Sequence, residues 1–501
     1  MRCARVPEVS GIFYLLMDET QPIRLRFAPS PTGYLHVGGL RTALYNFLLA
    51  RQRGGAFVLR IEDTDRARIV EGAIDNLVNI LRWSGLTYDE GPGCDGPYGP
   101  YVQSSRLDLY RKYVHELLAG GKAYRCFCTP ERLSLMRKEQ EALKVHPKYD
   151  RFCLKQTTQA IQRQLDAGLS FVIRMKVPDD RIVGFDDVIR GAVEFNSDQI
   201  DDQVLLKSDG FPTYHLANVV DDHSMGITHV IRGEEWLSST PKHVILYEFF
   251  GWELPVFAHL PLLLNPDKSK LSKRQGDVAV EDYREKGYLP EALINFVALL
   301  GWNPGTEEEI FSLDDLIRRF SLEQVNKSGA VFNVEKLDWL NFQHLRRKSS
   351  GDILEMLREQ LSRSRFRDLV LRDEYLMSVI ESMRERITFV RDILEKSPYF
   401  FEAPSAYDSS AAKKHWTAQT PAQLLFLAEE FEKLSDPGKS DFENCLRRTA
   451  EILQTRDGTL IHAVRLAISG MGAGPGVFDI LAILGKEESV GRMKSAAEKV
   501  R

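Results

Sequence analysis

The 501-residue sequence lacks the features of several large classes of protein. No apolar run reaches the roughly 20 residues that a membrane helix needs, because charged residues and prolines interrupt even the apolar stretch 246–264. Its 6 cysteines are too few for a disulfide scaffold, and no internal repeat is visible. We therefore expect a soluble, globular, intracellular protein that does not enter a membrane.

The sequence also has little excess of one charge. It contains 66 Lys and Arg against 71 Asp and Glu, a formal net charge of −5 at pH 7. This balance argues against a general nucleic-acid coat, so any RNA contact would depend on local basic patches. A hydrophobic content of 43% is ample for several buried cores, and the length predicts about three to five domains.

The most informative segment is 26–39, RFAPSPTGYLHVGG. Before it, residues 23–27 alternate between apolar residues and arginine, which predicts a strand; after it, residues 40–48 repeat apolar positions at helical spacing. The prolines and glycines between them predict a turn. At the expected helix start, free N–H groups and the helix dipole attract phosphate. The residues placed there are His36, Gly38 and Gly39.

A second basic motif, KLSKR at 270–274, follows the turn-rich stretch 265–268. Each motif alone is ambiguous, since a histidine in a Pro/Gly turn and a solvated basic loop are both common. Together, and in this order, they supply a phosphate-binding turn and lysines for a triphosphate, which indicates ATP activation. They resemble the HIGH and KMSKS signatures of class I aminoacyl-tRNA synthetases.

Three longer segments narrow this resemblance. RIEDTDRAR at 60–68, FPTYHLAN at 211–218 and IRGEEW at 231–236 resemble glutamyl-tRNA synthetases of the bacterial type. The resemblance extends from about residue 23 to about residue 345, and a compatible helical pattern follows. It implies a cytoplasmic, monomeric ligase that activates L-glutamate with ATP and Mg²⁺ to glutamyl adenylate. The glutamyl group then passes to the 3′ end of tRNA-Glu, with release of AMP and pyrophosphate.

The resemblance also implies a set of site residues. The catalytic residues are His36, Lys270 and Lys273. The ATP-binding residues are His36, Gly38, Gly39, Glu235, Trp236, Lys270 and Lys273. The residues that bind L-glutamate are Arg26, Ser30, Glu62, Tyr214, Asn218 and Arg232.

These assignments are chemically reasonable, because a carboxylate such as Glu62 suits an ammonium group and two arginines suit a carboxylate. Each residue also has an ordinary structural explanation. Glu62 could form a surface ion pair, Tyr214 and Trp236 could be core aromatics, and Arg232 could pair with a nearby carboxylate. The candidate partners of Arg232 are Glu234 and Asp222.

Three cysteines lie close together in the sequence: Cys126, Cys128 and Cys153. Three sulfur ligands are one short of a tetrahedral zinc shell, so a fourth must be Tyr149, His146 or something distant; the alternative is three free thiols. Some bacterial glutamyl-tRNA synthetases carry a similar CxC…YxxxC element. The resemblance therefore implies one structural Zn²⁺ on Cys126, Cys128, Tyr149 and Cys153. The other cysteines, expected to be inert, are Cys3, Cys94 and Cys445.

The expected fold class is α/β: a Rossmann-like catalytic domain with an α+β insertion, followed by all-α anticodon-binding domains. The expected segments are an N-terminal extension (1–21, with Met17 as an alternative start), two halves of the catalytic domain (22–106 and 205–262), the acceptor-binding insertion with the zinc element (107–204), a stem-contact domain with the KLSKR loop (263–348) and two helical anticodon-binding domains (349–410 and 411–501). Apolar spacing predicts helices over 106–118, 292–300, 353–361 and 376–390, a linker at 404–410 and a loop at 469–476.

Four alternatives remain open at this point. A non-catalytic nucleotide- or RNA-binding descendant should have lost His36 or the second lysine, yet both are present. A glutamate-transferring tRNA-modifying paralogue would lack the long helical region after Leu345. A glutaminyl-tRNA synthetase would replace APSP at 28–31 with a glutamate-containing run. A non-discriminating enzyme that also glutamylates tRNA-Gln is compatible with every motif.

Overall fold

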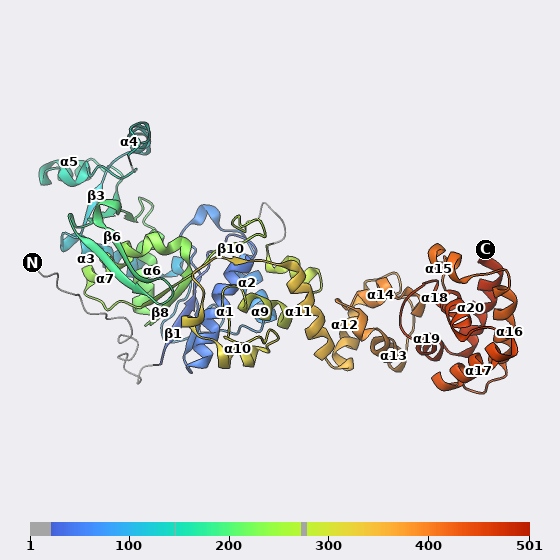
Figure 1. Cartoon of the computed structure of the whole chain (residues 1–501). Helices are drawn as coiled ribbons and strands as arrows, with labels where there is room; N and C mark the ends of the chain where they lie inside the picture. Colours follow the sequence, from blue (N-terminus) through green and yellow to red (C-terminus); the bar gives the residue numbers. More distant parts are fainter. Residues whose placement is uncertain (1–21, 146, 272–277, 501) are drawn as a thin grey trace, which may run out of the picture. The chain divides into compact units, whose positions relative to one another are not determined.

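The computed structural model describes residues 22–145, 147–271 and 278–500. The predictions for residues 1–21, His146 and Lys273 lie outside the described residues. The chain divides into two compact units, which are described separately (Figure 1). The first contains the residues up to Glu285 and Leu293–Val334, and the second contains Lys286–Ala292 and the residues from Glu335 onward.

A six-stranded sheet forms the centre of the first unit, in the order β2-β1-β8-β9-β5-β6. All neighbouring strands are parallel except β5 and β6. The strands are β1 (Arg24–Phe27), β2 (Ala56–Leu59), β5 (Ile182–Asp187), β6 (Gly191–Asn196), β8 (His229–Gly233) and β9 (Val256–Leu260). The chain runs from β1 through α1 (Val37–Gln52) to β2 and later returns to β8 on the other side of β1. The carboxyl ends of β1 and β8 therefore border the crevice where such sheets bind ligands.

The strand predicted from the alternation at 23–27 is confirmed by β1, and it is buried on both faces. Leu25, Arg26 and Phe27 are all buried. Arg26 tolerates burial because its guanidinium forms an ion pair with Asp222 of α6 (Tyr214–Ser224), with Nε 2.9 Å from Oδ1. The partner that stabilises this buried arginine is thus far away in sequence.

The segment 107–204 does not form one separate sheet. Strands β3 (Ala123–Cys126), β4 (Val172–Met175) and β7 (Val204–Leu206) form a small antiparallel sheet, whereas β5 and β6 join the central sheet beside β9. The helices of this segment are α3 (Leu107–Ala119), α4 (Pro130–Ala142) and α5 (Thr158–Asp166). Figure 1 shows α4 and α5 near β3, and the predicted helix at 106–118 is confirmed by α3.

The remaining α-helices and strands up to residue 347 are α2 (Ala73–Trp83), α7 (Thr240–Phe250), α8 (Val280–Glu285), α9 (Pro290–Ala298), α10 (Leu313–Arg319), α11 (Val334–Arg347) and the paired strands β10 (Leu263–Leu264) and β11 (Ala330–Val331). Nearly all of α11 and the start of α9 belong to the second unit. The helix predicted at 292–300 is confirmed by α9, and Gly301 follows with φ of 104°, a conformation that ends regular helix at low cost only for glycine.

The second unit is helical, as the sequence predicts. Its helices from residue 350 are α12 (Ser350–Ser362), α13 (Asp373–Met383), α14 (Asp392–Lys396), α15 (Ser409–His415), α16 (Thr420–Glu432), α17 (Lys439–Ile452), α18 (Asp457–Ser469), α19 (Val477–Leu484) and α20 (Lys486–Lys499). One apolar cluster of buried side chains connects them. None of the helices in the described part of the chain has the length and apolar character that a membrane crossing requires.

Two boundaries in this unit differ from the predictions. The apolar stripe at 376–390 is not one helix, because α13 ends at Met383 and the buried residues Ile387 and Val390 come from the irregular chain that follows. The predicted linker at 404–410 is shorter, because Asp408 caps α15 by accepting the Ser410 N–H at 2.9 Å. The loop at 469–476 is confirmed between α18 and α19.

Candidate active site

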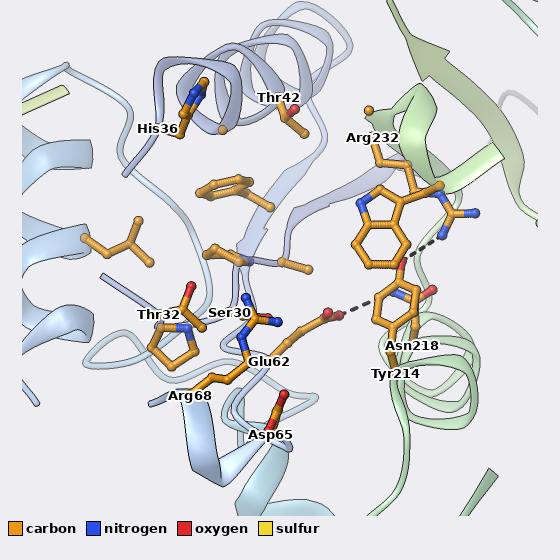
Figure 2. Close-up of a pocket in the computed structure, with 18 of the residues that line it drawn as sticks. Ser30, Thr32, His36, Thr42, Glu62, Asp65, Arg68, Tyr214, Asn218 and Arg232 are labelled. Carbon is orange, nitrogen blue, oxygen red and sulfur yellow. Dashed lines mark hydrogen bonds between the residues drawn. The ribbon is translucent and has the colours of Figure 1, made fainter. Parts of the chain in front are cut away.

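A cavity of about 700 Å³ lies at the carboxyl ends of β1 and β8. The turn after β1, the residues after β2, the start of α6 and the segment after β8 all line it. Figure 2 shows His36 at the start of α1, and Tyr214 and Asn218 opposite Glu62. All the residues predicted to bind glutamate line this cavity: Arg26, Ser30, Glu62, Tyr214, Asn218 and Arg232.

The start of α1 presents a backbone donor to the cavity. His36 caps the helix, and its Nδ1 accepts the Gly38 N–H at 2.9 Å. This bond occupies one of the N–H groups that the sequence assigns to phosphate. The N–H of Gly39 has no hydrogen-bond partner among the described residues. It is therefore the donor in this turn that remains for an anion.

A second cavity, of about 350 Å³, adjoins the first. Lys270 and Leu271 line it. The residues that line both cavities are His36, Gly38, Gly39, Thr42, Gly233 and Glu235. The structure thus brings Lys270 of the second signature to the histidine and glycines of the first.

The residues on either side of 272–277 form backbone hydrogen bonds near the two cavities. On one side, the Leu271 N–H donates to the Leu263 carbonyl at 2.9 Å. On the other, the Val278 carbonyl accepts the Val37 N–H, also at 2.9 Å. Leu271 and Val278, the described residues on either side of 272–277, therefore both lie beside the HVGG turn.

Glu235 and Trp236 lie in a short 3₁₀ helix, Glu234–Ser239, that follows β8. The Trp236 side chain is 38% exposed, so it is not a core tryptophan. Its ring lies 4.4 Å from the ring of Tyr214, between centroids. An aromatic face at the edge of a cavity suits a flat heterocycle such as adenine.

Arg232 is buried and held mainly by uncharged groups. Its Nη1 donates to the Tyr214 hydroxyl at 2.8 Å, and its Nη2 donates to Thr240 Oγ1 at 2.8 Å. Its Nε donates to His259 Nε2 at 3.0 Å. The alternative explanation, an ion pair of Arg232 with Glu234 or Asp222, is absent among the described residues, because those carboxylates pair with other arginines. A ligand with a carboxylate would therefore supply the countercharge that Arg232 does not receive from the described residues.

A buried ionic cluster lies beside Arg232. Asp222 accepts hydrogen bonds from Arg26 (2.9 Å) and Arg60 (2.6 Å), and Arg60 also donates to Glu62 at 3.1 Å. Burial tends to raise the pKa of Asp222, but Arg26 and Arg60 outweigh it and lower that pKa. Burial raises the pKa of Glu62, with Arg60 opposing. The Asn218 amide contacts Glu62 at 3.3 Å; in its alternative orientation it bridges Asp222 and Arg60.

The cavity also contains residues that the motifs did not single out. They are Thr32, Thr42, Asp65, Arg68 and Lys207, and Figure 2 shows the first four around the same space. Asp65 and Arg68 belong to the 60–68 segment on which the family resemblance depends, so that segment contained a signal for them. Nothing local in the sequence distinguishes Thr42, which reaches the site from within α1.

The three clustered cysteines form a compact group at the end of β3 of the small sheet. The Sγ atoms of Cys126, Cys128 and Cys153 lie within 4.8 Å of one another. The Tyr149 hydroxyl lies 3.4 Å from Cys126 Sγ and 3.3 Å from Cys128 Sγ. Sulfur ligands around Zn²⁺ are separated by about 3.8 Å when each Zn–S bond is about 2.3 Å. The side chains therefore have a suitable spacing for this metal.

Comparison with known proteins agrees with this geometry. Residues 22–339 match the catalytic domain family of class I tRNA synthetases for E and Q, and residues 352–497 match an anticodon binding domain family. The glutamate–tRNA ligase of Chloroherpeton thalassium is 53% identical over 496 residues, which cover 96% of this chain and 98% of that protein. That of Chlorobium chlorochromatii is 50% identical, over 95% and 98% of the two chains. A crystal structure of a glutamate tRNA ligase from Elizabethkingia meningosepticum, in complex with its amino acid, has a TM-score of 0.91 at 41% identity, and covers 96% of this chain and 100% of that one.

The chain therefore belongs to the class I aminoacyl-tRNA synthetases, in the group for glutamate and glutamine. Within that group it belongs with the bacterial glutamate–tRNA ligases. The family and the fold class predicted from the sequence are both confirmed. The full-length match also excludes a paralogue without the anticodon-binding region.

Proposed function

We propose that the two adjoining cavities activate L-glutamate with ATP and then transfer the glutamyl group to tRNA-Glu. The observation that carries this proposal is the convergence of residues from both ATP signatures on two adjoining cavities, the first of which also contains Arg232, a buried cation with no carboxylate partner among the described residues. His36, Gly39 and Lys270 border the phosphate side, and Arg26, Tyr214 and Arg232 border the other. The glutamate α-carboxylate attacks the α-phosphate of ATP, so catalysis depends on positioning and on charge stabilisation.

The proposed roles follow from this arrangement. His36, Gly38, Gly39, Glu235, Trp236, Lys270 and Lys273 bind ATP, with His36 and the two lysines at the reacting phosphate. Arg26, Ser30, Glu62, Tyr214, Asn218 and Arg232 bind glutamate. Arg232 and the Tyr214 hydroxyl face the side-chain carboxylate, and Glu62 faces the ammonium group. Mg²⁺ accompanies ATP, as in class I synthetases generally.

The decisive experiment combines aminoacylation with ATP–pyrophosphate exchange in the presence of tRNA. Purified protein should charge tRNA-Glu, and Lys270→Ala or Lys273→Ala should slow activation by about a hundredfold or more, because each variant removes a charge that stabilises the transition state. Lys268→Ala, in the preceding turn, is the matched control and should retain nearly full activity. Wild-type rates in both lysine variants would contradict their proposed role.

The same preparation decides the tRNA specificity. Charging of tRNA-Glu alone would define a discriminating enzyme, whereas charging of tRNA-Gln as well would define the non-discriminating alternative.

We propose a monomer that works in the cytoplasm, where translation supplies uncharged tRNA. We also propose that 107–204 contacts the acceptor end, 263–348 the stem, and 349–410 and 411–501 the anticodon.

We further propose one structural Zn²⁺ on Cys126, Cys128, Tyr149 and Cys153. The spacing of their side chains supports it, as does the charge around them. Arg132 Nη1 lies 3.4 Å from Cys128 Sγ, and the Arg174 guanidinium lies 4.1 Å from the centroid of the Tyr149 ring. These cations would offset the negative charge of a thiolate-rich zinc shell.

A further inference from the structure

The hydrogen bonds around Arg232 determine where the protons lie on two buried histidines. Arginine has only donors, so every nitrogen that it contacts must be an acceptor. His259 Nε2 accepts from Arg232 Nε at 3.0 Å, and His243 Nδ1 lies 3.3 Å from Arg232 Nη1. The protons therefore belong on His259 Nδ1 and His243 Nε2. Burial lowers the pKa of both imidazoles, which keeps them neutral.

Each of these two N–H groups has a hydrogen-bond acceptor on the side of the imidazole away from Arg232. His259 Nδ1 lies 2.6 Å from Asp187 Oδ2, and His243 Nε2 lies 3.2 Å from His215 Nδ1. Burial tends to raise the pKa of Asp187, but the His259 hydrogen bond outweighs it and that pKa is lowered. Asp187 is thus an ionised carboxylate separated from Arg232 by one neutral imidazole.

Asp187 is also fixed by the backbone. Its Oδ1 accepts N–H groups from Ile189 (3.0 Å) and Arg190 (2.9 Å) in the turn between β5 and β6. Strand β5 is the strand of the 107–204 segment that pairs with β9, which carries His259. The two residues therefore join the predicted insertion to the glutamate side of the cavity.

We propose that Asp187 and His259 are positioning residues that set the specificity for glutamate. His259 holds Arg232 in one orientation, and Asp187 supplies the negative charge through His259. The side of Arg232 that faces the cavity is thereby left to the carboxylate of the substrate. This inference rests on the proposed function. Arg26 shows the contrasting arrangement, since Asp222 contacts its guanidinium directly.

The chemistry of the ligand follows from the donors that remain. Arginine has five N–H groups, and Arg232 uses four of them on Tyr214, His243, Thr240 and His259. The fifth, on Nη2, has no partner among the described residues. Because the Tyr214 oxygen accepts from Arg232, its own hydrogen is also available. Two donors and a positive charge suit a carboxylate, and a neutral amide gains less from them.

The test is a pair of substitutions at one position. In His259→Gln, the side-chain amide can donate to Asp187 and accept from Arg232, as the neutral imidazole does. In His259→Leu, neither bond is possible. We expect His259→Leu to raise KM for glutamate by at least about tenfold, because hydrogen bonds to a charged group have effects of this size. The inhibition constant of glutamine and KM for ATP should change less than about threefold, and His259→Gln should recover most of the loss.

His229→Leu provides the matched control. His229 is also buried, in the neighbouring strand β8, but it bonds to Thr228 and does not line the cavity. It should leave all three constants unchanged, and thermal unfolding of each variant shows which changes arise from instability. Asp187→Asn, which keeps the shape and removes the charge, should act in the same direction as His259→Leu.

Two results would overturn the inference. One is an unchanged KM for glutamate in His259→Leu; the other is an equal rise in the glutamate, glutamine and ATP constants, which would indicate a purely structural role. If instead the wild-type protein fails to charge tRNA with glutamate, the proposed function itself fails.

Discussion

At the scale of single residues, the site depends on which charges have partners. Asp222 accepts from both Arg26 and Arg60, so neither of those arginines lacks a countercharge. Arg232, by contrast, contacts hydroxyl groups and neutral imidazoles. An unpaired buried charge is costly, and a protein retains one where a ligand completes it. Arg232 is therefore the residue at which loss of charge should change substrate recognition most.

We expect Arg232→Gln to lower kcat/KM for glutamate by at least roughly tenfold, which corresponds to about 1.4 kcal/mol. The physical reason is that glutamine retains a donor but not the positive charge that a carboxylate requires. KM for ATP should change little. Steady-state aminoacylation with varied glutamate measures the effect.

The matched control is Arg181→Gln, which removes an arginine whose ion pair with Glu248 is half exposed and outside the cavity. This variant should retain the wild-type constants. If Arg232→Gln also retained them, Arg232 would not belong to the glutamate pocket.

At the scale of elements, the cysteine cluster lies beside a helix that buries few side chains. Helix α4 has no buried residue, and the cluster beside it consists of only a few side chains. A bound metal adds its binding free energy to the stability of such a segment, because a preformed site is absent from the unfolded chain. The proposed zinc should therefore contribute most to the order of α4 and of the segment that carries Tyr149 and Cys153.

We expect about one zinc per chain by metal analysis. Removal of the metal by a chelator should increase amide hydrogen exchange in α4 and in residues 147–157, and leave exchange in α16 and α20 unchanged, as these helices lie in the other compact unit. Cys153→Ser should lose the metal, whereas Cys445→Ser, at a buried cysteine outside the cluster, should retain it. Full activity and unaltered exchange in metal-free protein would exclude a structural zinc.

At the scale of the whole molecule, burial lowers the pKa of several histidines in the first unit. Burial lowers the pKa of His215 to about 3 and that of His229 to about 4, and it also lowers the pKa of His243 and His259. In the unfolded chain a histidine has a pKa of about 6.5. Below that pH the unfolded state binds more protons than the folded state, so the free energy of unfolding falls as the pH falls.

We expect His229→Gln to reduce this pH dependence. Between pH 7 and pH 5, loss of this one imidazole should remove about 2 kcal/mol of the decrease in stability, since its pKa is about 4 when folded and about 6.5 when unfolded. Denaturant unfolding of the wild type and the variant at both pH values measures the difference, and contributions from all other groups cancel. Equal pH dependence in the two proteins would show that the pKa of His229 in the folded state is close to its value of about 6.5 in the unfolded chain.

The sequence by itself determined the family, the fold class and the four segments (26–39, 60–68, 211–218 and 231–236) that supply most of the cavity lining. It could do so because local rules govern these features: the Pro/Gly turn after β1 places His36 at a helix start, and apolar spacing predicts helices such as α1, α9 and α12. Local rules did not predict features that depend on contacts between residues far apart in the sequence. Arg26 is buried because Asp222 pairs with it, and the stripe at 376–390 belongs to a core that irregular chain also fills.

Only the tertiary structure decided how the charges are distributed within the site. No spacing in the sequence indicates that Asp222 pairs with Arg26, or that β5 carries Asp187 to His259 and thus to Arg232. These contacts join residues that are tens to hundreds of positions apart. The contacts of His259 with Asp187 and Arg232 depend on the strand order β8-β9-β5, whereas the contact of Arg26 with Asp222 joins β1 to α6. A buried charge is stable only beside suitable partners. The tertiary structure therefore determines that Arg26 is paired within the protein, whereas Arg232 remains available to the carboxylate of a ligand.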